Sequence, residues 1–246
     1  MLAAAATAVA VPPAASYRFP ANTARLNHNF FQVRKVTYRP PGTEQNLLKE
    51  INLSLQEKRQ AYLLWLNYIS GGFYIPNSVF VQFWFDIWTE WEWKDHPFAV
   101  GIVFQFPERY FLADTVLEEV TFGWPRQKAD LLLKEQLALN LQNAFNSVGL
   151  TTISLDEDPQ ALSGGFKRRL ALAIQLVQTP DLLLLDEPLA GLDWKARADV
   201  VNLLKDLKKH HTILVVSHDL RELYPLVDYS WRMEMGGSLK EEALPV

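Results

Sequence analysis

Short, unbroken apolar runs alternate along this chain with longer segments of helical periodicity, which predicts an α/β fold with a parallel sheet. The apolar runs are too short for separate helices and are typical of strands that are buried on both faces. The predicted strands cover residues 100–104, 181–185 and 212–216, and the predicted helices cover residues 131–148, 166–178 and 194–209. The apolar residues of the 166–178 helix fall on more than one face, which predicts that this helix is largely buried.

Two further patterns predict antiparallel pairing. Residues 31–38 alternate imperfectly and predict a strand, which a proline- and glycine-containing turn separates from its returning partner at residues 47–55. Beyond residue 230 the pattern predicts a hairpin with Gly236 and Gly237 as its turn. We therefore expect a small antiparallel unit before the parallel sheet and a hairpin after it.

Candidate chemistry lies at the ends of two predicted elements. Asp186 and Glu187 directly follow a strand, at the carboxyl edge where an α/β sheet gathers its functional groups. Leu162-Ser163-Gly164-Gly165 precedes a helix that we expect to start near Phe166. Ser163 is a favourable N-cap, and the glycines let a ligand approach the backbone closely. Free amides and the positive end of the helix dipole at this point suit a phosphate.

Composition narrows the class of protein. A chain of 246 residues fits one large domain, and its net charge of -4 offers no strong basic field, so we expect no nucleic-acid partner. The absence of cysteine excludes disulfides and thiolate metal sites, and it agrees with a reducing compartment. The five histidines show no HExxH or similar metal-ligand spacing.

The beginning of the chain differs from the rest. Residues 1–43 contain no Asp or Glu but carry five basic residues, and the first sixteen residues are mostly Ala, Val and Pro. Such a leader is typical of an organelle transit peptide, whereas the lack of a charge before the apolar run argues against a secretory signal. A disordered Ala/Pro tail is the alternative. We assign residues 1–29 to this arm and residues 30–246 to a single domain.

The stretch from Leu162 to Asp193 resembles the ABC ATPase family. LSGG at residues 162–165 is similar to the family's signature motif, LLLLDE at residues 182–187 to its Walker B strand, and residues 189–193 to its D-loop. The three motifs occur in order and at compatible spacing. The sequence GIVFQFPE resembles that of cobalt-type and energy-coupling-factor ATPases, and the sequence PLAGLDWKARADV resembles that of plastid members of the plant I subfamily.

This resemblance implies an α/β fold like that of P-loop NTPases: a parallel sheet core, an antiparallel β subdomain, and a helical subdomain at residues 106–165. It also implies ATP and Mg²⁺ as ligands. Asp186 is expected to help hold Mg²⁺, and Glu187 to orient the water that attacks the γ-phosphorus. Gln105 matches the Q-loop glutamine, which touches both the metal and that water, and His218 matches the H-loop histidine, which contacts the γ-phosphate.

The remaining family positions concern the base and the second subunit. Tyr38 stands at the end of the first strand, where the family stacks an aromatic side chain on adenine; an exposed turn tyrosine is the alternative. Ser163, Gly164 and Gly165 are expected to contact the nucleotide of an opposing subunit, and Asp193 to communicate across the dimer. The family stacks two such domains head to tail, so this chain needs a second ABC ATPase subunit.

The phosphate-binding loop of the family has no counterpart in this sequence. No lysine of the chain is followed by Ser or Thr, so the motif GxxGxGK[ST] is absent, and the expected fold is disrupted at residues 61–98. This segment holds five of the eight tryptophans and no charge between Ala61 and Phe85. A membrane span with several polar interruptions and a Trp-rich interface are two interpretations. We favour a third, a wrong exon or translated intron, because family motifs flank the segment on both sides.

The resemblance implies an ATPase subunit that converts ATP to ADP and phosphate and powers separate integral membrane transport subunits from the stromal side of a chloroplast membrane. Whether this chain hydrolyses ATP itself is left open, because its Walker A loop is missing. A cytoplasmic location is the alternative to the chloroplast. Two other functions are weighed: a catalytically silent regulatory or scaffold subunit, and a soluble ABC ATPase unconnected with transport.

Overall fold

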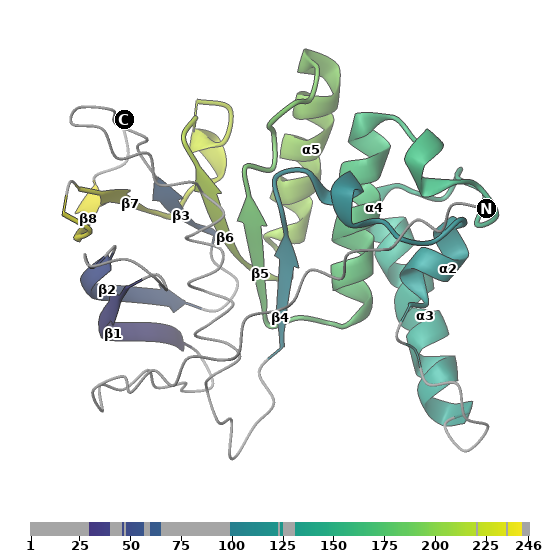
Figure 1. Ribbon diagram of the computed structural model, residues 1–246, viewed down its shortest axis with the longest axis horizontal. Coiled ribbons are helices and arrows are strands. Elements are labelled where there is room, and N and C mark those ends of the chain that lie inside the picture. Colours follow the sequence, from purple (N-terminus) through teal and green to yellow (C-terminus); the bar gives the residue numbers. More distant parts are fainter. Residues whose placement is uncertain are drawn as a thin grey trace, which may run out of the picture.

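A six-stranded sheet forms the centre of the protein in the computed structural model (Figure 1). The structure describes residues 30–39, 46, 48–56, 60–64, 99–122, 124, 131–219, 221–234 and 236–242. Neighbouring strands are parallel except for the last pair, β7 and β8. The order across the sheet is β4 (Val100–Val103), β5 (Leu182–Asp186), β6 (Thr212–Ser217), β3 (Gln60–Leu64), β7 (Tyr229–Met233) and β8 (Leu239–Glu242).

The predicted antiparallel pairings are both confirmed. Strands β1 (Phe30–Tyr38) and β2 (Leu48–Gln56) form a two-stranded sheet in which Phe30 lies opposite Gln56 and Tyr38 opposite Leu48. Strands β7 and β8 form the predicted hairpin. Its turn contains Gly236 at φ +97° and Gly237 at φ +83°, a backbone conformation that glycine adopts without steric cost.

The helices follow the predicted periodicity closely. Helix α3 (Leu131–Val148) has the predicted bounds, and α5 (Trp194–Leu207) ends two residues before the predicted end. Helix α4 (Gly164–Val177) begins two residues earlier than expected. The short helix α2 and three 3₁₀ turns complete the described helical structure: α2 (Val116–Val120), η1 (Pro107–Tyr110), η3 (Pro159–Ala161) and η4 (Tyr224–Leu226).

Two apolar cores lie on opposite faces of the parallel sheet, which explains why its strands read as unbroken apolar runs. On β5, Leu183 and Leu185 pack with the helices, whereas Leu182 and Leu184 pack with the residues of β1 and β2. Helices α3, α4 and α5 therefore cover one face, and the small antiparallel sheet covers the other (Figure 1). This arrangement confirms the predicted α/β class, with its parallel core and antiparallel β unit.

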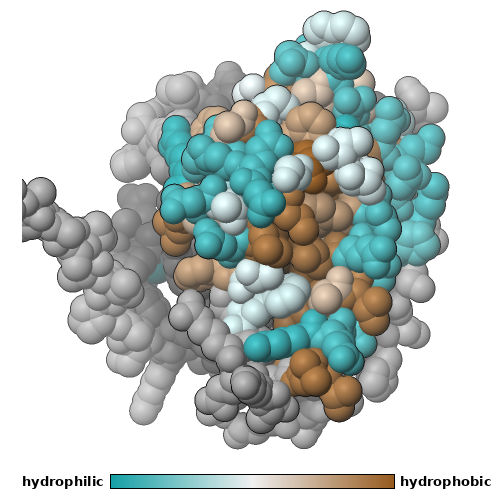
Figure 2. Space-filling model, turned by 90° about the vertical axis from the view of Figure 1, so that its right-hand side faces the viewer, coloured by the Kyte–Doolittle hydropathy of each residue, from teal (hydrophilic) through white to brown (hydrophobic). Residues whose placement is uncertain are grey.

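The face that carries α2 and α3 exposes several apolar side chains (Figure 2). Leu131 and Leu132, in the first turn of α3, are 61% and 81% exposed, whereas Phe145 and Val148 near its end are buried. The periodic pattern therefore predicted this helix correctly, and the helix packs against the core from Leu137 onward. None of the helices in the described ranges has the length and apolar character that crossing a bilayer requires.

Strand β3 corrects the predicted extent of the disrupted segment. Residues 60–64 form a parallel strand in the middle of the sheet, between β6 and β7, so the family-like arrangement continues as far as Leu64. The arm at residues 1–29 and the segment at residues 65–98 lie outside the described residues. The proposed domain division, including the helical subdomain at residues 106–165, stays a prediction.

Candidate functional site

The two acids after β5 are buried at the carboxyl edge of the sheet. Asp186 is 3% exposed and Glu187 is 2% exposed. Glu187 leaves the strand with φ at +44°, in the left-handed region that a residue with a long side chain seldom adopts. Its backbone N–H donates to the carbonyl of Val216 on β6, at 2.8 Å. This turn directs the Glu187 side chain toward the end of the neighbouring strand.

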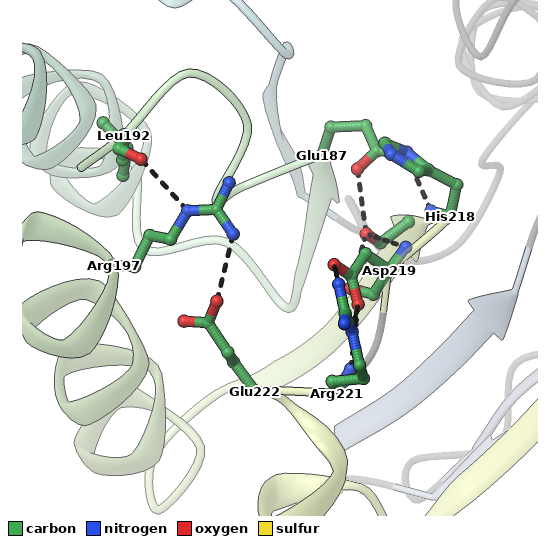
Figure 3. Close-up of polar contacts among 8 residues, drawn as sticks. Glu187, Leu192, Arg197, His218, Asp219, Arg221 and Glu222 are labelled. Atoms are coloured by element: carbon green, nitrogen blue, oxygen red, sulfur yellow. Dashed lines mark hydrogen bonds and ion pairs between the residues drawn. The ribbon is translucent and has the colours of Figure 1, made fainter. Parts of the chain in front are cut away.

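The Glu187 carboxylate accepts hydrogen bonds from two consecutive residues at the end of β6 (Figure 3). Its Oε2 accepts from Ser217 Oγ at 2.8 Å, and its Oε1 accepts from the His218 backbone N–H at 2.9 Å. His218 Nδ1 lies 2.5 Å from the same Oε1. When Nδ1 carries the ring proton it donates to this oxygen, and Nε2 is then the ring nitrogen left for another partner. The structure thus brings two predicted catalytic residues into direct contact.

The Asp186 carboxyl group lies in different surroundings from those of Glu187. Burial, followed by the charge of the adjacent Glu187, raises its pKa from 3.8 to about 7, whereas Arg168 and the Gln105 backbone oppose the shift. Within the described part of the chain, the buried Oδ1 of Asp186 accepts no hydrogen bond. A buried carboxylate oxygen without a donor fits a hard cation, and Mg²⁺ is commonly bound by one or two carboxylates together with substrate phosphates.

Gln105 lies just beyond β4, next to Asp186. The Gln105 backbone opposes the rise in the pKa of Asp186, and the Gln105 carbonyl accepts from Arg168 Nη2 at 2.6 Å. Four of the predicted site residues, Gln105, Asp186, Glu187 and His218, therefore gather along the edge formed by β4, β5 and β6. Strand β3 ends at the same edge, because Leu64 is the parallel partner of Ser217.

Ser163, Gly164 and Gly165 form a second group at the start of α4. Ser163 Oγ accepts from the Phe166 N–H at 3.4 Å, which confirms its predicted role as N-cap. The two glycines are the first residues of the helix itself, and not part of a loop before it. A Cβ added to Gly165 would lie 3.2 Å from Ala196 Cβ, so the absence of a side chain lets α4 approach α5 closely.

Asp193 caps the neighbouring helix in the same way. Its Oδ1 accepts from the Ala196 N–H at 2.8 Å, in the first turn of α5. The N-termini of α4 and α5 consequently lie side by side, with Ser163 on one and Asp193 on the other. Positive helix ends and free amides at adjacent positions make a surface that suits an anion.

Arg197 links the Asp193 turn to the segment that follows His218 (Figure 3). Its Nε donates to the Leu192 carbonyl at 3.0 Å, and its Nη1 pairs with Glu222 Oε1 at 3.0 Å. Beside this pair, Arg221 binds the Asp219 carboxylate and lowers the pKa of Asp219 to about 2. Charged side chains therefore fasten both loops that border the site.

Tyr38 lies apart from these groups. It is 5% exposed and packs in the apolar core between β1–β2 and the large sheet, with Leu48 and Trp231 in the same cluster. The structure therefore does not support the alternative of an exposed tyrosine at a turn. Its role in adenine stacking stays a prediction.

The sequence analysis did not single out Ser217, Arg168 or Arg197. Ser217 lies in the strand that precedes His218, and its hydroxyl has the right position to reach Glu187 only because Glu187 adopts a left-handed backbone. Arg168 had a detectable signal, since it is a charged residue in a helix whose other faces are largely apolar. Arg197 gave none, because arginine is common in mixed-charge helices.

Comparisons with known proteins agree on one family. The sequence profile described as "ABC transporter" matches residues 66–190. ABC transporter I family member 11, chloroplastic, of Arabidopsis thaliana is 58% identical over 235 residues, covering 89% of this chain and 84% of that protein. The energy-coupling factor transporter ATP-binding protein EcfA2 of Acetivibrio thermocellus is 38% identical over 139 residues, covering 56% of this chain and 48% of that protein. The chain therefore spans about half the length of this bacterial relative.

Solved structures support the fold. CbiO1 of Clostridium perfringens, described as part of the ABC transporter complex cbiONQ, superposes with a TM-score of 0.68 at 24% identity, covering 85% of this chain and 86% of that one. The ATP-binding cassette MJ0796, solved as a dimer bound to ADP and Pi, gives a TM-score of 0.61 at 21% identity, covering 87% of this chain and 99% of that one. At these identities the likeness concerns the fold alone.

Proposed function

This chain belongs to the ABC transporter family, and from that premise we propose that it is the ATPase-type subunit of a transporter, with its own phosphate-binding loop missing. One observation carries the proposal. Gln105, Asp186, Glu187 and His218 gather at the sheet edge where β3 also ends, although they come from distant parts of the sequence. An edge that carries two buried acids and a histidine is suited to hydrolysis of a phosphoanhydride such as the terminal bond of ATP.

Each residue of the edge has a distinct role in this proposal. Glu187, held by Ser217 and His218, orients and polarises the attacking water. His218 presents Nε2 to the γ-phosphate, since Nδ1 is bound to Glu187. Asp186 and Gln105 would hold Mg²⁺, mostly through water, and the bound ion would neutralise charge on the phosphates.

The missing GxxGxGK[ST] motif limits what the chain does alone. That loop gives an ABC ATPase several amide and lysine contacts with the phosphates. At about 1.5 kcal/mol for each charged hydrogen bond, the loss of three contacts lowers ATP affinity by about three orders of magnitude. We therefore infer that the chain binds and hydrolyses ATP poorly by itself.

A second ABC ATPase subunit is the partner that restores function. The paired N-termini of α4 and α5, with Ser163, Gly164, Gly165 and Asp193, form the surface that this chain offers to a nucleotide bound by an intact partner. The relatives EcfA2 and CbiO1 are named as parts of transporter complexes, which supports partnership with membrane subunits. One working site per heterodimer is the expected result.

A mixing experiment tests this partnership. The purified chain is added to an intact family member, and ATP hydrolysis is compared with that of the same mixture containing Ser163→Arg, which fills the anion surface. Stimulation by the wild-type chain and its loss with Ser163→Arg are expected. The matched control is Ser154→Arg, an exposed serine in the turns between α3 and η3, which should stimulate like wild type. Equal stimulation by all three chains would contradict the partnership.

A chloroplast location is part of the proposal. The similar Arabidopsis protein carries "chloroplastic" in its name, and the acid-free basic arm of this chain has the composition of a transit peptide. We propose stromal action at a plastid membrane after removal of the arm. Import of a fluorescent protein fused to residues 1–43 into isolated chloroplasts is expected, and exclusion of that fusion would contradict this location.

The absent phosphate loop favours one alternative, a catalytically silent regulatory or scaffold subunit. Purification of the tagged chain from chloroplast membranes separates the candidates. Integral membrane proteins that co-purify, together with Ser163-dependent ATPase activity, support the transporter subunit. Membrane proteins without that activity support the silent subunit, and recovery free of membrane proteins supports a soluble ABC ATPase.

A further inference from the structure

Arg168 is the one arginine that is fully buried in the described residues, with 3% of its surface exposed. Its side chain projects from α4 toward the loops that follow β4 and β5. Its Nη1 donates to the Phe104 carbonyl at 2.9 Å, and its Nη2 donates to the Gln105 carbonyl at 2.6 Å and the Ala190 carbonyl at 3.2 Å. One guanidinium thus joins three separate segments of the chain: the signature helix, the loop of Gln105 and the loop that leads to Asp193.

The loop of Gln105 is anchored to α4 through its carbonyl groups. The carbonyls of Gln105 and of Phe104 before it both accept from the Arg168 guanidinium. Asp186 in turn senses the arginine, which opposes the rise in its pKa. The position of the Gln105 loop relative to β5 therefore depends on a side chain that belongs to neither element.

Nearby acidic side chains favour a positive charge at Arg168. Burial lowers the pKa of its guanidinium, and Glu108, Asp186 and Glu187 act in the opposite direction and favour the charged form. A buried cation that three carboxylates surround is costly to remove, because the acids then lose their nearest positive charge. Its neighbour Arg169 differs, since it binds the Val148 carbonyl at 3.4 Å and pairs with Asp199 at 3.4 Å, away from the acidic edge.

We propose that Arg168 is a positioning residue that locks the Gln105 loop and the Ala190 turn to the signature helix, so that these parts of the site move as one unit. The functional meaning of Gln105 and Asp186 rests on the proposed function. The lock itself rests only on the hydrogen bonds of Arg168, and its test needs no nucleotide. Failure of one proposal is therefore distinguishable from failure of the other.

Amide hydrogen exchange of the full chain tests the lock. In Arg168→Met, the Gln105 amide and the amides of residues 190–192 are expected to exchange about tenfold faster than in wild type, because their segments lose shared anchors. The amides of α3 at residues 137–148 are expected to keep their wild-type rates. The matched control is Arg169→Met, which should leave Gln105 and residues 190–192 unchanged.

The conservative variant Arg168→Lys separates positioning from packing. Lysine keeps the charge and can donate to a carbonyl, but it lacks the fork that reaches two loops at once. We expect Arg168→Lys to restore most of the protection of the Gln105 amide and little of the protection at residues 190–192. If Arg168→Met does not fold, Arg168→Lys replaces it as the test. Wild-type exchange in both segments of a folded Arg168 variant, equal acceleration in α3, or a lysine variant no better protected at Gln105 than methionine would each overturn the proposal.

Discussion

Two strands of the same sheet, β5 and β3, end at one edge with unequal chemistry. Strand β5 leads to the buried acids Asp186 and Glu187, and the Glu187 carboxylate accepts hydrogen bonds from Ser217 and His218 at the end of β6. Strand β3 ends at Leu64, opposite Ser217, and the sequence that follows contains no GxxGxGK[ST] motif. In the proposed site, the acid that would orient water is therefore held by contacts with the end of β6, whereas the grip on phosphate would depend on the segment after β3.

The largest effect is expected when a phosphate-binding loop is supplied after β3. Replacing residues 65–98 with the corresponding segment of an intact family member, including GxxGxGK[ST], supplies the missing phosphate contacts at the end of β3. Affinity for ATP is expected to rise by about three orders of magnitude, or about 4 kcal/mol. Isothermal titration calorimetry measures the change, and the same graft with its loop lysine changed to alanine is the control. A graft that folds but gains no affinity would show that β3 does not end where a phosphate loop can work.

The second effect concerns the stability that the protein loses by burying Asp186 at the end of β5. Burial raises the pKa of Asp186 from 3.8 to about 7, so the folded protein keeps a proton that the unfolded chain releases. Stability therefore falls as pH rises from about 4 to about 7 and stays low above that range. Asp186→Asn removes this cost and is expected to stabilise the protein by about 2–4 kcal/mol at pH 7.5, with little difference at pH 4.

Urea denaturation across this pH range measures the effect of Asp186→Asn. The exposed acid Asp199 provides the control, because Asp199→Asn should give nearly the same pH dependence as wild type. A wild-type protein that is more stable than Asp186→Asn at pH 7.5 would mean that the buried carboxylate is better compensated than its surroundings indicate.

The third effect concerns the hydroxyl that holds Glu187. Ser217 is 4% exposed and donates to Glu187 Oε2 at 2.8 Å. Ser217→Ala leaves a buried carboxylate with one donor fewer, and a loss of about 1–3 kcal/mol in the free energy of unfolding is expected. Chemical denaturation measures it, with Ser147→Ala as control because Ser147 is exposed and bonds only within its own helix. Equal stability of both variants would argue against a buried hydrogen bond at Glu187.

The smallest effect is expected at His218. Its side chain is 55% exposed although Nδ1 lies 2.5 Å from Glu187, so solvent screens the contact. His218→Ala is expected to cost less than about 1 kcal/mol of stability. In the grafted chain the same substitution should abolish most ATP hydrolysis while ATP binding persists. A large loss of stability would instead assign His218 a structural role at the edge.

Much of the architecture could be predicted because burial on both faces gives a clear pattern. The runs that became β5 and β6, and the periodicity of α3, follow directly from apolar packing. Asp186, Glu187 and His218 were found because they follow such strands. The start of α4 was misplaced by two residues, since glycines after an N-cap read as a loop although Gly164 and Gly165 are helical.

Other features depend on distant contacts that no local pattern contains. The left-handed backbone of Glu187 and its bond with Ser217 arise where β5 and β6 meet. The carbonyls that Arg168 binds lie 22 to 64 residues away in the sequence. Strand β3 was missed because the apolar run that starts at Ala61 continues without a break into the tryptophan-rich segment.

Titration of the purified, unaltered chain with a fluorescent ATP analogue in the presence of Mg²⁺ tests the central claim most directly. An intact family member that contains GxxGxGK[ST] is measured alongside it. This chain is expected to bind the analogue about three orders of magnitude more weakly than the intact protein. Micromolar affinity equal to that of the intact protein would contradict it, because the acidic edge and the signature helix alone would then suffice to hold the nucleotide.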